Sequence, residues 1–148
     1  MRSRHPTLFL SKKEKERIVA ALHEAEKETS GEIRVHFAKG NEKEIFNHAK
    51  EIFEKIGMTK TKHRNGVLIF LEVKSKHFAI LGDQGIHDKV PENFWNQVVQ
   101  KMALHFKQDR FGEGIVEGIL MIGKELKAYF PPGPNDTNEI PDRISHSY

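Results

Sequence analysis

Cysteine is absent from this chain of 148 residues. Disulfide frameworks, thiolate zinc sites and cysteine nucleophiles are therefore excluded, and with them the cysteine-dependent phosphatases and proteases. Long hydrophobic runs are missing as well, since near the start only residues 8–10 are apolar before charged residues resume. A membrane span needs about 20 apolar residues, so the sequence predicts neither a signal peptide nor a membrane helix, and we expect a cytoplasmic protein without membrane contact.

A large excess of charge of one sign is also absent. The chain has 24 basic and 21 acidic residues, a net charge of +3, and both signs are interspersed. Such mild basicity permits an anionic partner without requiring one. No basic stretch alternates with aromatic residues, so we expect no nucleic-acid binding. The phosphate-loop patterns GxxxxGK[ST] and GxGxxG do not occur, and the nine histidines are scattered without an HExxH pair.

Four segments place apolar residues at helical spacing. The first begins at a capping box formed by Ser11 and Glu14 and ends near residues 29–31. The second covers residues 45–56 and is followed by Gly57, which suits a left-handed end of a helix. The third follows Pro91 and continues through Phe106, and the fourth covers residues 113–129.

Three other segments are typical of strands. Residues 33–37 alternate apolar with polar side chains, which predicts a strand with one face less fully covered. Residues 66–73, GVLIFLEV, are almost entirely apolar and predict a strand at the sheet centre. Residues 77–82 follow after a turn too short for a crossover, which predicts an antiparallel hairpin. The helix between the first two strands predicts that these strands are parallel.

This topology places the starts of the first two strands and the end of the third at one edge of the sheet. Carboxylate, amide and carbonyl oxygens of that edge are the hard ligands that Ca²⁺ and Mg²⁺ prefer. The next loop adds two acidic residues. The candidate metal ligands are Glu32, Asn65, Gly82, Asp83, Asp88 and Glu92. An alternative interpretation stays open, in which Asp83 accepts turn amides while Asp88 and Glu92 cap the next helix.

A basic loop, KTKHR at residues 60–64, leads directly into Asn65. Lys62 and Arg64 beside a bound metal ion would suit a phosphate group, so they are candidate anion-binding residues. A solvated basic loop is the alternative interpretation.

The segments TSGEIRVHF, RNGVLIFLEV, FAILGDQGIHDKVPENFW and FGEGIVEGI, with the tail NDTNEIPDRIS, together resemble the TPM domain family. The resemblance extends from residue 11 to about residue 145. It implies an α/β fold, a three-layer αβα sandwich with a mixed sheet of about four strands flanked by about four helices. Because the residue patterns indicate three strands, the fourth belongs to residues 39–44, to residues 57–65 or to the tail.

The family resemblance also implies a function. Divalent metal, especially calcium, recurs as a ligand in the family, and an acid phosphatase activity is attributed to one branch. The resemblance supports the metal-ligand role of Glu32, Asn65, Gly82 and Asp83, whereas Arg64 stands where many membrane-tethered relatives have an acidic residue. That departure sets this chain apart from those relatives at the candidate metal site.

We therefore expect one domain at residues 11–130, between an N-terminal extension at residues 1–10 and an extended tail at residues 131–148. The predicted function is that of a monomeric regulatory or interaction module that binds one or two Ca²⁺ or Mg²⁺ ions and an unidentified protein partner. The alternatives are a metal-dependent phosphomonoester hydrolase, with Asp83 and Glu32 holding the ion and no catalytic residue assigned, and a metal-free interaction module.

Overall fold

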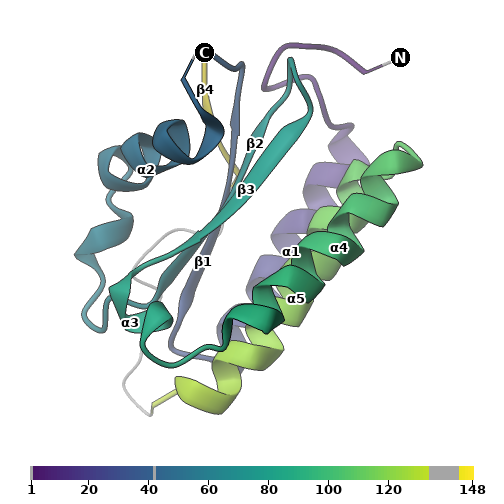
Figure 1. Ribbon diagram of the computed structural model, residues 1–148. Helices are drawn as coiled ribbons and strands as arrows, with labels where there is room; N and C mark the ends of the chain where they lie inside the picture. Colours follow the sequence, from purple (N-terminus) through teal and green to yellow (C-terminus); the bar gives the residue numbers. More distant parts are fainter. Residues whose placement is uncertain (1, 42, 134–143) are drawn as a thin grey trace.

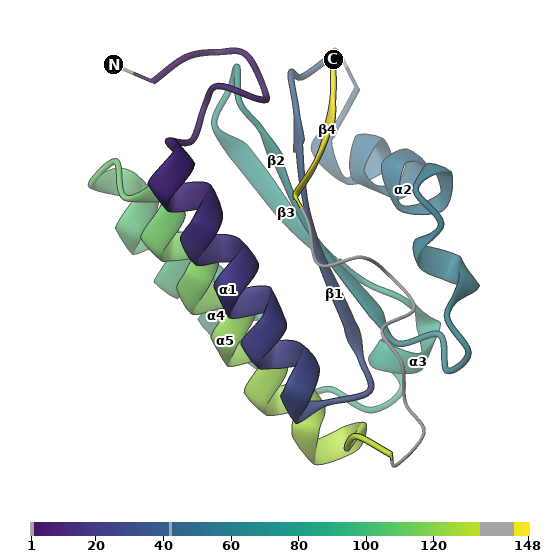
Figure 2. The ribbon, with the colours of Figure 1, turned by 180° about the vertical axis from the view of Figure 1, so that it is seen from behind.

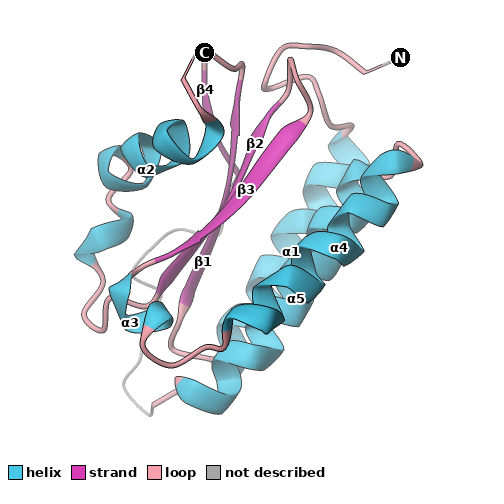
Figure 3. Cartoon of the chain, in the orientation of Figure 1, coloured by secondary structure: helices cyan, strands magenta, loops and turns pink. Residues whose placement is uncertain are grey.

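The computed structural model describes residues 2–41, 43–133 and 144–148. In these residues a four-stranded sheet lies between two layers of helices (Figure 1, Figure 3). Helix α2 (Ile45–Lys55) covers one face, and α1 (Lys12–Glu28), α4 (Glu92–Lys107) and α5 (Phe111–Tyr129) cover the other. This arrangement confirms the predicted α/β class and the three-layer sandwich.

The helices begin and end largely where the sequence predicts. The Glu14 N–H donates to Ser11 Oγ at 3.1 Å and the Ser11 N–H donates to the Glu14 carboxylate at 2.9 Å, so the capping box of α1 is formed. Gly57 follows α2 with a left-handed φ of 85°. Two short elements are not predicted by the sequence: the 3-10 helix η1 (Met58–Lys60) and helix α3 (Gln84–His87). Three or four residues carry no helical periodicity.

The strands are β1 (Glu32–Ala38), β2 (Gly66–Glu72), β3 (His77–Gly82) and β4 (Ile144–Ser147), in the order β3-β2-β1-β4. β1 is parallel to β2, and β2 is antiparallel to β3, as the crossover and the hairpin predict. β1 is also parallel to β4. The fourth strand therefore belongs to the tail, one of the three locations that the sequence left open. The rest of that tail, residues 134–143, lies outside the described residues.

The prediction that one face of β1 is less fully covered is wrong. All seven residues of β1 are buried. His36 is only 2 % exposed, because its ring stacks on Phe70 and its two ring nitrogens are hydrogen-bonded to Ser145 and Ser147 of β4, at 2.7 and 2.9 Å. The alternation of polar and apolar residues in β1 therefore reflects one face that packs in the hydrophobic core and one face whose polar residues are also buried.

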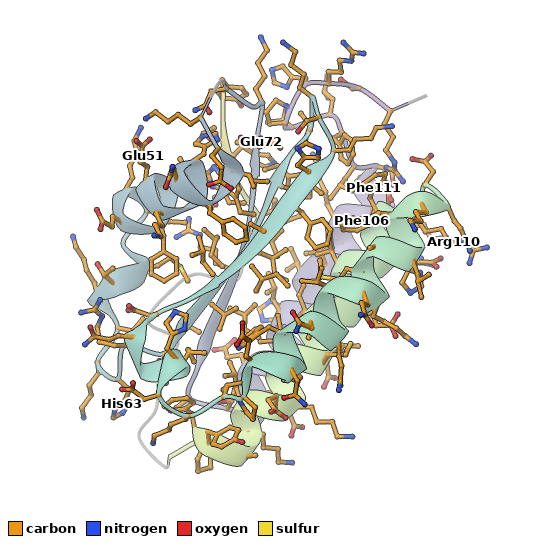
Figure 4. The ribbon with its side chains drawn as sticks, viewed as in Figure 1. Glu51, His63, Glu72, Phe106, Arg110 and Phe111 are labelled. Carbon is orange, nitrogen blue, oxygen red and sulfur yellow. The ribbon has the colours of Figure 1, made fainter. Side chains whose placement is uncertain are left out.

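Two hydrophobic cores hold the layers together. The larger core lies between the sheet and the three-helix layer, where the rings of Phe106 and Phe111 stack 4.6 Å apart and point toward the sheet (Figure 4). The smaller core packs Leu68 and Phe70 of β2 against Ala49, Ile52 and Phe53 of α2. The sheet is thereby fixed on both faces, so the loops at its ends are held in place by buried strands.

The N-terminal segment lies beside the start of α1 (Figure 2). The Arg2 guanidinium donates to both carboxylate oxygens of Glu14 at 2.8 Å and to Asp109 Oδ1 at 2.9 Å. Phe9 and Leu10 are buried in the larger core. This segment therefore joins α1 to the turn between α4 and α5. Across the described residues, no helix is both long and apolar enough to cross a membrane.

Candidate functional site

The starts of β1 and β2 and the end of β3 meet at one end of the sheet. Glu32 is the register partner of Gly66, and Val67 is that of Gly82. The Glu32 N–H donates to the Asn65 carbonyl at 3.3 Å, and the Asp83 N–H donates to the Gly66 carbonyl at 2.9 Å. The convergence of these loops, predicted from topology, is confirmed.

Helix α3 packs directly on the loop that precedes β2. The Gly85 N–H donates to the Arg64 carbonyl at 2.9 Å. A Cβ added at Gly85 would lie 2.5 Å from the His63 carbonyl oxygen and 2.7 Å from that of Arg64, and one added at Gly82 would lie 2.8 Å from Ile86 Cγ2. The two glycines around Asp83 therefore permit the close approach of α3 to the end of β3 and to the basic loop.

Gly85→Ala should lower the free energy of unfolding by about 1–3 kcal/mol, because both atoms that the new methyl group meets belong to the backbone and must shift. Urea denaturation measures this loss. Gln84→Ala, which changes the exposed neighbour on α3, is the control and should change the free energy by less than about 0.5 kcal/mol. Equal stabilities of the two variants would contradict the close packing of α3 on this loop.

The Asp83 carboxylate is buried and has two roles at this point. Its Oδ2 accepts from Arg64 Nε at 2.6 Å and its Oδ1 accepts from Arg64 Nη2 at 2.8 Å, a bidentate pair. Oδ1 also accepts the Gln84 N–H at 2.8 Å, which caps α3. The hydrogen bond with Asp83 raises the pKa of Arg64. Asp83 is therefore a turn cap, as the alternative interpretation expects, and also the partner of a cation.

Glu32, the first residue of β1, and Asn65, which directly precedes β2, are both buried. Because register partners share a face, Glu32 lies on the same face as the residues of β1 that pack toward α2. Both side-chain polar atoms of Asn65 lack a hydrogen-bond partner within the described part of the chain. Buried amides are normally paired, so Asn65 is a position where a bound water molecule or ion would supply what the protein does not.

The other candidate residues lie further out. Lys62 is exposed, and Asp88 is the exposed residue that ends α3. Glu92 is the first residue of α4 and lines a different groove, beside Trp95. The structure thus groups Asp83 with Arg64 and places Glu92 in another depression.

A pocket of about 270 Å³ opens beside the ion pair. Five of its lining residues carry side-chain oxygen or nitrogen atoms and were not singled out by the sequence: Lys50 and Glu54 of α2, Thr59 of η1, and Gln84 and His87 of α3. Glu54 belongs to the polar side of an amphipathic helix, where no periodic signal marks it. Glu54 becomes a lining residue of the pocket only because α2 packs beside β3, a tertiary arrangement that the spacing within α2 does not indicate.

The pocket lining contains oxygen donors that suit a hard cation, namely the carboxylates of Glu54 and Asp83 and the hydroxyl of Thr59, and it also contains the cationic side chains of Lys50 and Arg64. The arrangement of the donors is closed, however, because Arg64 occupies both oxygens of Asp83. Among residues 2–41, 43–133 and 144–148, no group of three histidine, aspartate or glutamate side chains is placed to hold a metal ion. A cation would bind Asp83 only in competition with Arg64.

The mixed four-stranded sheet between two helical layers, with β1 and β2 parallel and joined through α2, makes this an α/β sandwich domain. The chain belongs to the TPM domain family, whose model matches residues 4–125. This confirms the resemblance seen in the sequence. Comparison with curated proteins finds no match.

Solved structures support the same assignment. The NMR structure of protein BA42 from the psychrophilic bacterium Bizionia argentinensis is 44% identical, with a TM-score of 0.88 over 93% of this chain and 95% of that one. The N-terminal domain of a protein from P. gingivalis is 19% identical, with a TM-score of 0.67 over 82% and 78% of the two chains. The N-terminal domain of cg2496 from Corynebacterium glutamicum is 10% identical, with a TM-score of 0.61 over 88% and 81%. The last two similarities show the fold alone.

Proposed function

We propose that this TPM domain is a regulatory interaction module that responds to Ca²⁺ or Mg²⁺, with Asp83 as the residue to which the cation binds. The observation that carries the proposal is the Asp83–Arg64 pair. A buried carboxylate needs a positive partner. The present partner is a guanidinium whose side chain is 39% exposed, so it can turn into solvent while a divalent cation takes its place.

Two further features support an exchange of partners. The pocket beside the pair offers Glu54 and Thr59 as additional oxygen donors, and the amide of Asn65, unpaired within the part of the chain that the structure describes, lies at the same end of the sheet. Asp83 Oδ1 accepts the Gln84 N–H at the start of α3, so a change in the ligands of this carboxylate is transmitted to α3. Cation binding would in this way alter the surface that α3 presents to a partner.

The proposal predicts that Arg64→Ala strengthens the binding of Ca²⁺ or Mg²⁺. Arg64 competes for the Asp83 oxygens, so its removal should lower the dissociation constant at least about tenfold. Titration of each ion into ¹⁵N-labelled protein measures this constant and identifies the amides that move. An ion that binds only the folded protein also raises the melting temperature.

Two variants serve as controls for that titration. Lys60→Ala removes an exposed cation of η1 and should leave the dissociation constant within about twofold of the parent value. Asp83→Asn should abolish binding. The proposal is wrong if neither ion shifts the amides of residues 82–85 at millimolar concentration, or if Arg64→Ala binds no more tightly than the parent protein.

We do not extend the proposal to phosphomonoester hydrolysis. In that alternative Arg64 would stabilise the phosphate group, yet its guanidinium is held by Asp83 through two hydrogen bonds. Beyond the displacement of Arg64 by a cation, hydrolysis would require the freed guanidinium to bind a phosphate group at the same site.

A further inference from the structure

Strand β3 is an edge strand of the sheet. In the strand order it follows β2 with nothing beyond it among the described residues. Soluble proteins usually protect such an edge with charged residues, proline or a bulge. Residues 78–82, FAILG, contain neither a charge nor a proline, and their register with β2 is uninterrupted. The edge is therefore of the kind that pairs readily with another extended chain.

The backbone of β3 offers a regular set of hydrogen-bonding groups that no strand among the described residues uses. The Asp83 N–H bonds to the Gly66 carbonyl, which makes this a hydrogen-bonded pair of the antiparallel ladder. Because hydrogen-bonded and non-hydrogen-bonded pairs alternate along such a ladder, Phe78, Ile80 and Gly82 turn their N–H and C=O groups away from β2. Three residues thus present donors and acceptors at the spacing of a strand.

A groove of about 540 Å³ runs along this edge. In Figure 1 helix α2 lies on one side of β3 and α4 on the other. Phe46 of α2 is 50% exposed and Val99 of α4 is 39% exposed, and both line the groove with Trp95. The free backbone edge therefore lies between two apolar walls.

We propose that this groove binds an extended segment of another protein by strand addition to β3. The ladder would supply backbone hydrogen bonds, and the apolar walls would accept side chains at alternate positions of the segment. Glu92 is the acidic residue of the groove lining, and that lining includes no lysine or arginine among the residues the structure describes. A basic residue at one end of the bound segment would complement it.

The groove favours a single extended segment over a second copy of this domain. Its walls come from helices on both faces of the sheet, so the edge lies in a depression that a narrow chain can enter. A second β3 would approach with its own two flanking helices. The opposite edge of the sheet already pairs with a four-residue segment, because β4 of the tail adds to β1. The proposal goes beyond cation binding and does not depend on it.

The test titrates a blocked seven-residue peptide, alternating valine with threonine and carrying a lysine at each end, into ¹⁵N-labelled protein. EDTA is present, so failure of cation binding does not affect the result. The amides of Phe78, Ile80 and Gly82 should shift. N-methylation of the peptide amides along one edge should abolish binding and along the other edge should not, since an added strand uses alternate amides only.

Val99→Ser and Leu104→Ser form a matched pair of variants, since both residues are exposed on α4 and only Val99 lines the groove. Val99→Ser should weaken peptide binding about tenfold, and Leu104→Ser by less than about twofold. No amide shift at about 1 mM peptide, which would mean a dissociation constant well above this concentration, would overturn the proposal. So would equal binding of the two methylated peptides, or a dimer in sedimentation whose β3 amides are protected without peptide.

Discussion

Replacing His48 with leucine should lower the free energy of unfolding by about 3–5 kcal/mol. His48 of α2 and Glu72 at the end of β2 are both buried, and His48 Nδ1 lies 2.6 Å from Glu72 Oε2. Leucine fills a similar volume but cannot hydrogen-bond, so the Glu72 carboxylate would remain buried without this partner. Figure 4 shows Glu72 on the side of the sheet that α2 covers.

A second substitution separates the charge from the packing. In the double variant His48→Leu with Glu72→Leu no carboxylate is left buried, and replacement of a whole buried pair by apolar residues is often neutral or stabilising. Urea denaturation of the two variants should therefore show most of the lost stability restored in the double variant. A double variant that is no more stable than His48→Leu would contradict the view that the unpaired carboxylate causes the loss.

Lowering the pH from 6.5 toward 4 should destabilise the protein through His36. Burial, and then the positive charges of Arg34, His146, His48 and Lys55, lower the pKa of His36 from 6.5 to about 4. The unfolded chain takes up a proton near pH 6.5, whereas the folded protein resists it until about pH 4. Stability from neutral His36 is thus complete above pH 6.5 and is lost as the pH falls, by about 3 kcal/mol at most.

Thermal melting across this window measures the effect, and His36→Asn is the control because asparagine does not titrate there. The variant should show a clearly shallower loss of stability between pH 6.5 and 4.5. A further loss at lower pH has a different source. Burial opposes ionisation of Glu14, but its hydrogen bonds with Arg2 lower its pKa to about 2, and this stability declines only below about pH 4.5. An unchanged slope in His36→Asn would contradict the assignment to His36.

Much of the architecture follows from local patterns. The capping box at Ser11, the helical spacing of α2 and the short turn before β3 each predict a feature that the structure contains. The burial of β1 could not be predicted in the same way. Arg34 and His36 look like residues of an exposed face, yet Arg34 reaches the Ile56 carbonyl just after α2, and His36 is bonded to Ser145 of β4, more than 100 residues later.

The candidate site was predictable to the level of which loops meet. Topology alone places Asp83 near Asn65 and Glu32, whereas the partner of Asp83 depends on how the basic loop turns. Arg64 adopts a left-handed φ of 50° and directs its guanidinium to Asp83, a conformation that a string of basic residues does not indicate. The metal-ligand roles of Glu32, Asn65, Gly82, Asp83, Asp88 and Glu92 stay predictions.

The position of β4 in the sheet has a consequence for the rate of folding. His36 and Ser145 are 109 residues apart, and Glu14 and the Gly112 N–H that it accepts are 98 residues apart. Of the strand pairs in the described chain, only β2 with β3 is a hairpin; β1 and β2 are joined through α2, and β1 pairs with β4 from the other end of the chain. Chains dominated by such distant pairings close large loops before they gain contacts, and they fold over about milliseconds to seconds. The hairpin can form early, and the tail strand must wait for β1 to be in place.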